Sequence, residues 1–143
     1  MDPNLKAGIS ATEHILVERD RSIAFMGETA RVYSTPSMVN DVEYACLRLI
    51  QGHLAEEQSS LGMHVSIDHL APTPVGCEVE IRVTVSLVEG RKVTLDAEVR
   101  DAVEVVGRGV HVRYVIDVAR HGLRVAEKRK LLESRTRAGA LPA

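Results

Sequence analysis

Three side chains in this sequence have the types and positions that acid–base chemistry requires: Thr35, Glu43 and His69. A hydroxyl can act as a nucleophile, an imidazole can accept its proton near neutral pH, and a carboxylate can orient either group. Each residue also has an ordinary structural interpretation. Thr35 can cap a helix, Glu43 can be a solvated residue, and His69 can be a structural histidine. The local patterns leave both interpretations open.

A helix is predicted over residues 36–53, and Glu43 lies on it. Ser34 or Thr35 can supply the N-cap oxygen, and we expect Thr35 to serve both as this cap and as a site hydroxyl. Pro36 suits the first turn, because its missing N–H would have no partner there. At about 100° per residue, Glu43 falls at the border of an apolar stripe. That stripe consists of Met38, Val39, Val42, Ala45, Cys46, Leu49 and Ile50.

His69 is expected at the end of a strand. In SSLGMHVSIDHLAPTP, period-2 alternation places Met63, Val65 and Ile67 on one covered face. His69 continues that parity and is followed by a loop that contains proline. An imidazole at the inner rim of a sheet is well placed to act as an acid or a base.

Three further segments show strict alternation of apolar and polar residues. The expected inward sets are Cys77, Val79, Ile81, Val83, Val85 and Leu87, then Val93, Leu95, Ala97 and Val99, then Val110, Val112, Tyr114 and Ile116. The alternation predicts a sheet with one covered side, and the tight connection at Glu89–Arg91 predicts antiparallel pairing.

These elements predict an α+β fold in which the helix covers an antiparallel sheet, formed by a single domain over residues 1–135. Residues 10–19 are weakly strand-like, and residues 20–34 are expected to form a loop. Residues 118–135 are expected to form a surface helix, followed by a disordered tail over 136–143.

The composition excludes several classes of function. The net charge of −2, with aromatic residues at 3%, gives no basic, aromatic-rich surface for nucleic acid. No stretch reaches the roughly 20 apolar residues that span a membrane, and MDPNLKAGIS shows no signal-peptide pattern. Cys46 and Cys77 lie on predicted apolar faces, so we expect two buried thiols and a cytoplasmic protein. The remaining histidines have no metal-ligand spacing, so no metal site is expected.

The order and spacing of four stretches resemble the fluoroacetyl-CoA thioesterase-like family of hot-dog-fold acyl-CoA thioesterases. The stretches are VYSTPSMVNDVEYAC, SSLGMHVSIDHLAPTPVG, VEGRKVT and GRGVHVRYVID. The resemblance implies a sheet wrapped around one central helix, with a Thr35, Glu43 and His69 catalytic site. It also implies that Gly62 and Arg113 contact the substrate, although parity turns Arg113 away from the expected inner face.

The resemblance implies hydrolysis of an acyl-CoA thioester, without a further cofactor, by a homodimer or a dimer of dimers. The N-terminus of the helix and the Gly62 N–H would then stabilise the oxyanion. The fluoroacetyl-specific branch has an aromatic-rich lid, whereas FMGETARVY holds only Phe25 and Tyr33, so a general small acyl group is expected. A non-catalytic acyl-CoA-binding protein and a hot-dog hydratase or dehydratase are the alternatives.

The basic residues of the C-terminal segment also have two interpretations. They can form an ordinary solvated helix face, or they can contact the phosphates of coenzyme A. The basic residues are Arg120, Arg124, Lys128, Arg129, Lys130, Arg135 and Arg137, against Glu127 and Glu133.

Overall fold

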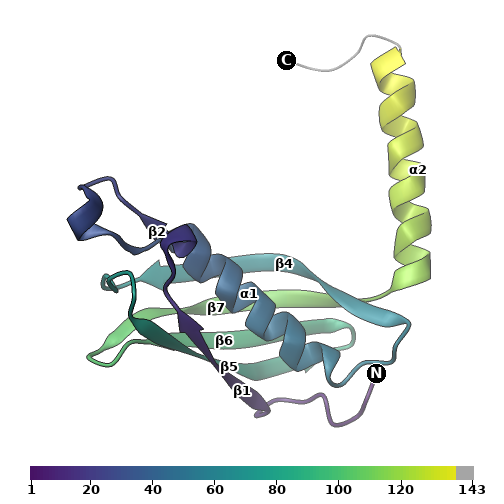
Figure 1. Ribbon diagram of the computed structural model, residues 1–143. Helices are drawn as coiled ribbons and strands as arrows, with labels where there is room; N and C mark the ends of the chain where they lie inside the picture. The colour runs from purple at the N-terminus through teal and green to yellow at the C-terminus, as the bar shows by residue number, and fades with distance from the viewer. Residues whose placement is uncertain (138–143) are drawn as a thin grey trace.

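The computed structural model describes residues 1–137 as an antiparallel sheet with one long helix packed on one of its faces (Figure 1). The strands are β1 (Ser10–Leu16), β2 (Ser22–Ile23), β3 (Val32–Tyr33), β4 (Gln58–His69), β5 (Glu78–Glu89), β6 (Lys92–Arg100) and β7 (Val105–Asp117). The helices are α1 (Thr35–Gln51) and α2 (Val118–Arg137), with short 3-10 turns at Arg19–Arg21 and Glu28–Ala30.

The main sheet has five strands in the order β1-β5-β6-β7-β4, and all neighbouring pairs are antiparallel. β4 is therefore an edge strand, although it comes directly after α1 in the chain. β2 and β3 pair with each other in a separate ribbon. The predicted α+β arrangement of a helix over an antiparallel sheet is confirmed.

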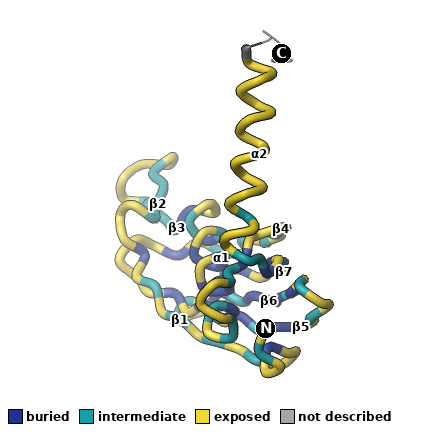
Figure 2. Tube along the Cα trace, turned by 90° about the vertical axis from the view of Figure 1, so that its right-hand side faces the viewer, coloured by how far each residue is buried: buried dark blue, intermediate teal, exposed yellow. Residues whose placement is uncertain are grey.

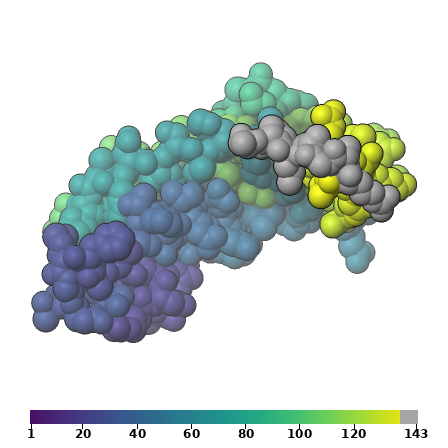
Figure 3. Space-filling view, turned by 90° about the horizontal axis from the view of Figure 1, so that it is seen from above, coloured from purple at the N-terminus to yellow at the C-terminus, as the bar shows by residue number. Residues whose placement is uncertain are grey.

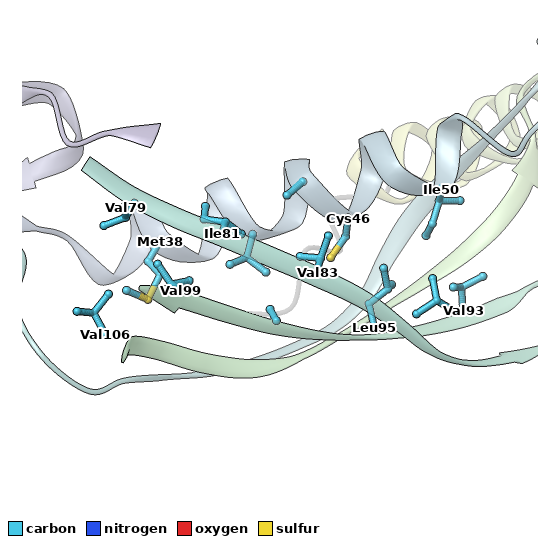
Figure 4. Packing of buried hydrophobic residues seen from close by; sticks show 14 of the residues in the cluster. Met38, Cys46, Ile50, Val79, Ile81, Val83, Val93, Leu95, Val99 and Val106 are labelled. Atoms are coloured by element: carbon cyan, nitrogen blue, oxygen red, sulfur yellow. The ribbon is translucent and has the colours of Figure 1, made fainter. Parts of the chain in front are cut away.

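The core lies between α1 and the sheet (Figure 4). Met38, Cys46 and Ile50 on the helix are fully buried, as are Ile81 on β5 and Leu95 on β6. This is the apolar pattern that the alternation predicts for β5 and β6. Because almost all of the core side chains are aliphatic, burial of their surface at roughly 25 cal/mol per Å² supplies most of the stabilisation.

The inner face predicted for β7 is wrong at Val110 and Tyr114, although Val112 is buried as predicted. Val110 and Tyr114 are 37% and 41% exposed, whereas His111, Arg113 and Val115 on the opposite parity are buried. The apolar pattern misleads here because the polar side chains on the covered face hydrogen-bond to one another, which lowers the penalty for burying them.

Three other residues expected inside are exposed. Leu87 is one of them, because the ladder between β5 and β6 shifts register between Val85 and Leu87. Cys77 precedes the first residue of β5 and is exposed, whereas Cys46 is buried as predicted. Met63 is exposed because the ladder between β4 and β7 shifts register between Gly62 and His64. Such a β-bulge interrupts the alternation of side chains along the strand.

α2 leaves the body of the molecule directly from the end of β7, and its described residues are almost all exposed (Figure 2). It lies at the opposite end of the molecule from β2 and β3 (Figure 3). The predicted surface helix is thus present and continues to Arg137; residues 138–143 of the predicted tail lie outside the described part. Within residues 1–137, no helix is long and apolar enough to cross a membrane.

Gly109 determines how closely β4 and β7 approach each other. A Cβ atom at this position would lie 2.0 Å from the Ser66 carbonyl oxygen and 2.9 Å from Ile67 Cα. Gly109→Ala should therefore push β4 away and lower the free energy of unfolding by about 1–3 kcal/mol or more, measured by chemical denaturation. Gly122→Ala is the matched control, because nothing lies within 4 Å of its Cβ position. Equal stability of the two variants would contradict this packing.

Candidate active site

The start of α1 leaves the Thr35 side chain free. Ser34 caps the helix, because its Oγ accepts a hydrogen bond from the Ser37 N–H at 3.1 Å. The expectation that Thr35 acts as the cap is therefore wrong. Ser34 has the extended backbone and small hydroxyl that the cap position favours, and Thr35 becomes the first helical residue.

Thr35 meets His69 across the fold. Thr35 Oγ1 lies 2.7 Å from His69 Nδ1, so the first residue of α1 contacts the last residue of β4. The loop after β4 holds this contact in place, since the Tyr33 N–H donates to the Thr73 carbonyl at 2.8 Å and the Leu70 N–H donates to the Val106 carbonyl at 2.7 Å. A hydroxyl at this distance can pass its proton to a neutral imidazole.

Burial is the largest influence on His69 and lowers its pKa below the ordinary value of 6.5, while the nearby Ala71 backbone acts in the opposite direction. Its Nε2 atom is buried and has no hydrogen-bond partner among residues 1–137. The Tyr33 ring meets the imidazole edge-on, with a centroid separation of 6.3 Å. His69 is thus held neutral near pH 7, as a general base requires.

A buried polar network positions Tyr33. Its hydroxyl donates to Asp41 Oδ2 at 2.5 Å, and Arg21 Nε donates to the same oxygen at 3.1 Å. Burial raises the pKa of Tyr33, so its hydroxyl stays protonated. Asp41 was missed by the sequence patterns, which place a carboxylate of this helix in solvent. Through these hydrogen bonds, Asp41 links α1 to the segment that precedes it.

Glu43 lies half-buried on α1, eight positions after Thr35. Within the described residues, no hydrogen bond joins it to Thr35 or His69. Its negative charge acts instead on Arg113 and His111, and it opposes the lowering of both their pKa values by burial. The structure therefore pairs Thr35 with His69, but no hydrogen bond of the described residues joins Glu43 to this pair.

Gly62 and Arg113 are partners across the β4–β7 ladder. Arg113 is only 7% exposed, and it donates from Nε to Ser60 Oγ at 2.8 Å and from Nη2 to the Ser60 carbonyl at 2.7 Å. A Cβ on Gly62 would lie 3.3 Å from His111 Cε1 and 3.5 Å from Arg113 Nη1. The absence of a side chain at Gly62 thus makes room for the two buried polar groups. The signal that could have revealed His111 is its spacing of two from Arg113, which places both on one face of a strand.

The other face of the sheet bears a hollow of about 770 Å³ lined by residues that include Asp68, Arg82, Asp96 and Arg108. None of the three candidate catalytic residues lines it. Within residues 1–137, no group of three or more His, Cys, Asp or Glu side chains could hold a metal ion.

Residues 17–119 match the family described as fluoroacetyl-CoA-specific thioesterase. The fluoroacetyl-CoA thioesterase of Streptantibioticus cattleyicolor is 33% identical over 101 residues, covering 71% of this chain and 73% of that protein. A solved structure of the fluoroacetyl-CoA thioesterase FlK superposes with a TM-score of 0.78 at 27% identity, covering 87% of this chain and 97% of FlK. A variant of FlK has been solved in complex with fluoroacetate and CoA.

The fold extends to more distant proteins. A Thermus thermophilus protein described as a thioesterase superfamily member superposes with a TM-score of 0.84 at 23% identity, covering 94% of this chain and 99% of that chain. This likeness bears on the fold alone. Taken with the family match over most of the chain, the relatives show that this hot-dog protein belongs to the fluoroacetyl-CoA-specific thioesterase family and is an acyl-CoA thioesterase.

Proposed function

We propose that this thioesterase hydrolyses a small acyl-CoA with Thr35, Glu43 and His69 as its catalytic residues, and with Gly62 and Arg113 in contact with the substrate. The observation that carries the proposal is the 2.7 Å contact between Thr35 Oγ1 and His69 Nδ1 at the start of α1. Thr35 is exposed, so a thioester carbonyl can reach it.

In this mechanism, His69 takes the proton of the attacking oxygen, which belongs to Thr35 or to a water beside it. The carbonyl oxygen becomes negative as the new C–O bond forms. The positive end of the α1 dipole and the backbone at the Gly62 bulge stabilise that charge. The C–S bond then breaks, the CoA thiol takes up a proton, and the net addition of water gives the free acid. Glu43 orients His69 or the water.

The segment before α1 supports a general small acyl group rather than fluoroacetate. Phe25 is 90% exposed and turns into solvent, and Tyr33 is engaged with Asp41. Within the stretch FMGETARVY, these are the only two aromatic residues. The names of the relatives give fluoroacetyl-CoA as their substrate. For this protein, fluoroacetyl-CoA is one candidate substrate among several small acyl-CoA esters.

We also propose that two copies pair through the free edge of β4. This strand is 12 residues long and, within the described chain, pairs as a strand only with β7, so its outer edge is open to another strand. In an antiparallel pair, the Gln58 end of one β4 lies beside the His69 end of the other. The Val118 N–H donates to the Glu57 carbonyl at 3.0 Å, which brings the base of α2 to that same end. Each active site would therefore receive the base of its partner's α2.

A cleft of about 150 Å³ lies at the first turns of α2, which are the base of this helix. Its lining is rich in positively charged side chains and includes Arg91, Arg120, His121 and Arg124. Among the described residues, Asp117 is the one carboxylate that lines the cleft, and it lies 3.3 Å from Arg91. We infer that this cleft binds the CoA phosphates of the neighbouring site, because guanidinium groups match phosphate oxygens in shape and charge.

The thiols of Cys46 and Cys77 are unpaired, which supports a cytoplasmic location.

His69→Ala and Glu43→Ala should fold, yet each should lose roughly 10²–10⁴-fold in kcat, as expected when an acid–base group is removed. Thr35→Ala should fall similarly, and Thr35→Ser should retain most of the turnover because it keeps the hydroxyl. Release of free thiol from acetyl-CoA and its homologues measures kcat. His14→Ala is the control, since His14 is exposed on β1 beside Glu78. A kcat near that of the wild type in His69→Ala would refute the assignment.

The pH dependence of kcat/KM should follow the protonation of His69. A general base works when neutral, and burial lowers the pKa of His69 below 6.5. We therefore expect kcat/KM to stay high at pH 6.5 and to fall only at lower pH, as His69 gains a proton. The residual activity of His69→Ala should lack this acidic limb. An acidic limb centred above 6.5 would show that a group other than the buried imidazole is titrating.

The shared site can be tested by mixing subunits. Arg120→Ala with Arg124→Ala should raise KM by about tenfold, as expected for losing solvent-exposed charge contacts. Mixing this variant with inactive His69→Ala should restore a component with the KM of the wild type, because one site of each mixed dimer combines an intact His69 with its partner's intact cleft. Lys130→Ala with Arg135→Ala, which removes two charges elsewhere on α2, is the matched control. If mixing restores nothing, the cleft does not serve the partner's site.

A further inference from the structure

Arg113 is a buried cation whose hydrogen bonds within the described residues all go to neutral groups. Among residues 1–137, its hydrogen bonds go to the Oγ and carbonyl oxygen of Ser60 and to the His111 ring. No ion pair joins it to a carboxylate of the described chain, and burial lowers its pKa. A buried guanidinium normally requires a carboxylate or phosphate partner. Its surroundings therefore indicate what it faces.

The neighbours of His111 determine its tautomer. Its Nδ1 lies 2.8 Å from the His64 carbonyl oxygen, which can only accept, so Nδ1 carries the proton and donates it. Its Nε2 lies 3.1 Å from Arg113 Nη1, which can only donate, so Nε2 is unprotonated and accepts. Both contacts require a neutral ring. His111 is thus a fixed acceptor that lies between a backbone carbonyl and the guanidinium.

Three of the five N–H groups of Arg113 are used by these contacts: the one on Nε, one on Nη1 and one on Nη2. One N–H remains on each terminal nitrogen. No hydrogen bond within residues 1–137 takes up this pair. Two parallel N–H groups on a buried guanidinium can bind oxygen atoms of a ligand.

We propose that His111 is a positioning residue: together with Ser60, it holds the buried Arg113 guanidinium so that its remaining N–H pair points to the reacting acyl group of the substrate. This inference rests on the substrate contact proposed for Arg113. It also explains why a glycine suits position 62, because a side chain there would contact His111 and Arg113.

Two substitutions separate the two hydrogen bonds of His111. The amide of glutamine reaches the position of Nε2 and can still accept from Arg113. The shorter amide of asparagine reaches the position of Nδ1 and keeps only the bond to His64. His111→Asn should therefore lose on the order of 10²-fold in kcat with little change in KM, whereas His111→Gln should recover most of the kcat. His14→Asn and His14→Gln, at an exposed position on β1, should both match the wild type.

A readout by 15N NMR does not depend on turnover. In the wild type, His111 should show the Nδ1-protonated neutral tautomer, and the Arg113 Nε–H should give a sharp, slowly exchanging signal. That signal should persist in His111→Gln and broaden in His111→Asn, while melting temperatures confirm that both variants fold.

The possible failures can be distinguished. If the wild type releases no thiol from any CoA ester, the proposed function fails, and the NMR signals still test the position of Arg113. An Nε2-protonated His111, equal kcat for the asparagine and glutamine variants, or a rise in KM in place of the fall in kcat would overturn the positioning role.

Discussion

The hydrogen bond between Thr35 and His69 is possible only if the first turn of α1 and the last residue of β4 meet, and much of the fold serves that meeting. Ser34 takes over the capping of the helix and thereby leaves the Thr35 hydroxyl free. The loop after β4 is bonded to Tyr33 on one side and to Val106 on the other. Tyr33 is in turn held by Asp41, two residues before Glu43 on α1. The nucleophile and its base thus lie on elements that are tied together by independent contacts.

The covered face of the sheet has two chemical zones. Under most of α1 it is aliphatic and packs as an ordinary core. Along β7 it carries a buried polar cluster of Ser60, His111 and Arg113, in which each member satisfies another. A buried cation is costly unless it is fully hydrogen-bonded. The retention of this cation is therefore more readily explained by the proposed site than by stability.

The helix and the strands of the sheet were predictable because one face of each is apolar with a clear period. His69 was predictable from parity, because no register shift separates it from Val65 and Ile67. Glu43 was found only as a residue at the border of a stripe. Gly62 and Arg113 came from the family resemblance alone.

The remaining features could not be predicted from local pattern, since their partners are distant in the chain. His111 and Asp41 are buried polar groups, and pattern analysis assigns such residues to solvent until a partner is known. For the same reason the inner and outer faces of β7 were exchanged. The contact of Thr35 could not be predicted either, because His69 lies 34 positions after it.

The most direct test of the central claim is thiol release by the wild-type protein from a panel of short, branched and aromatic acyl-CoA esters, followed together with melting temperature and the absorbance of an enoyl-CoA. The account predicts stoichiometric release of free CoA from at least one small acyl ester. A melting temperature that rises with CoA esters while no thiol appears, or a change in enoyl absorbance without thiol, would contradict it.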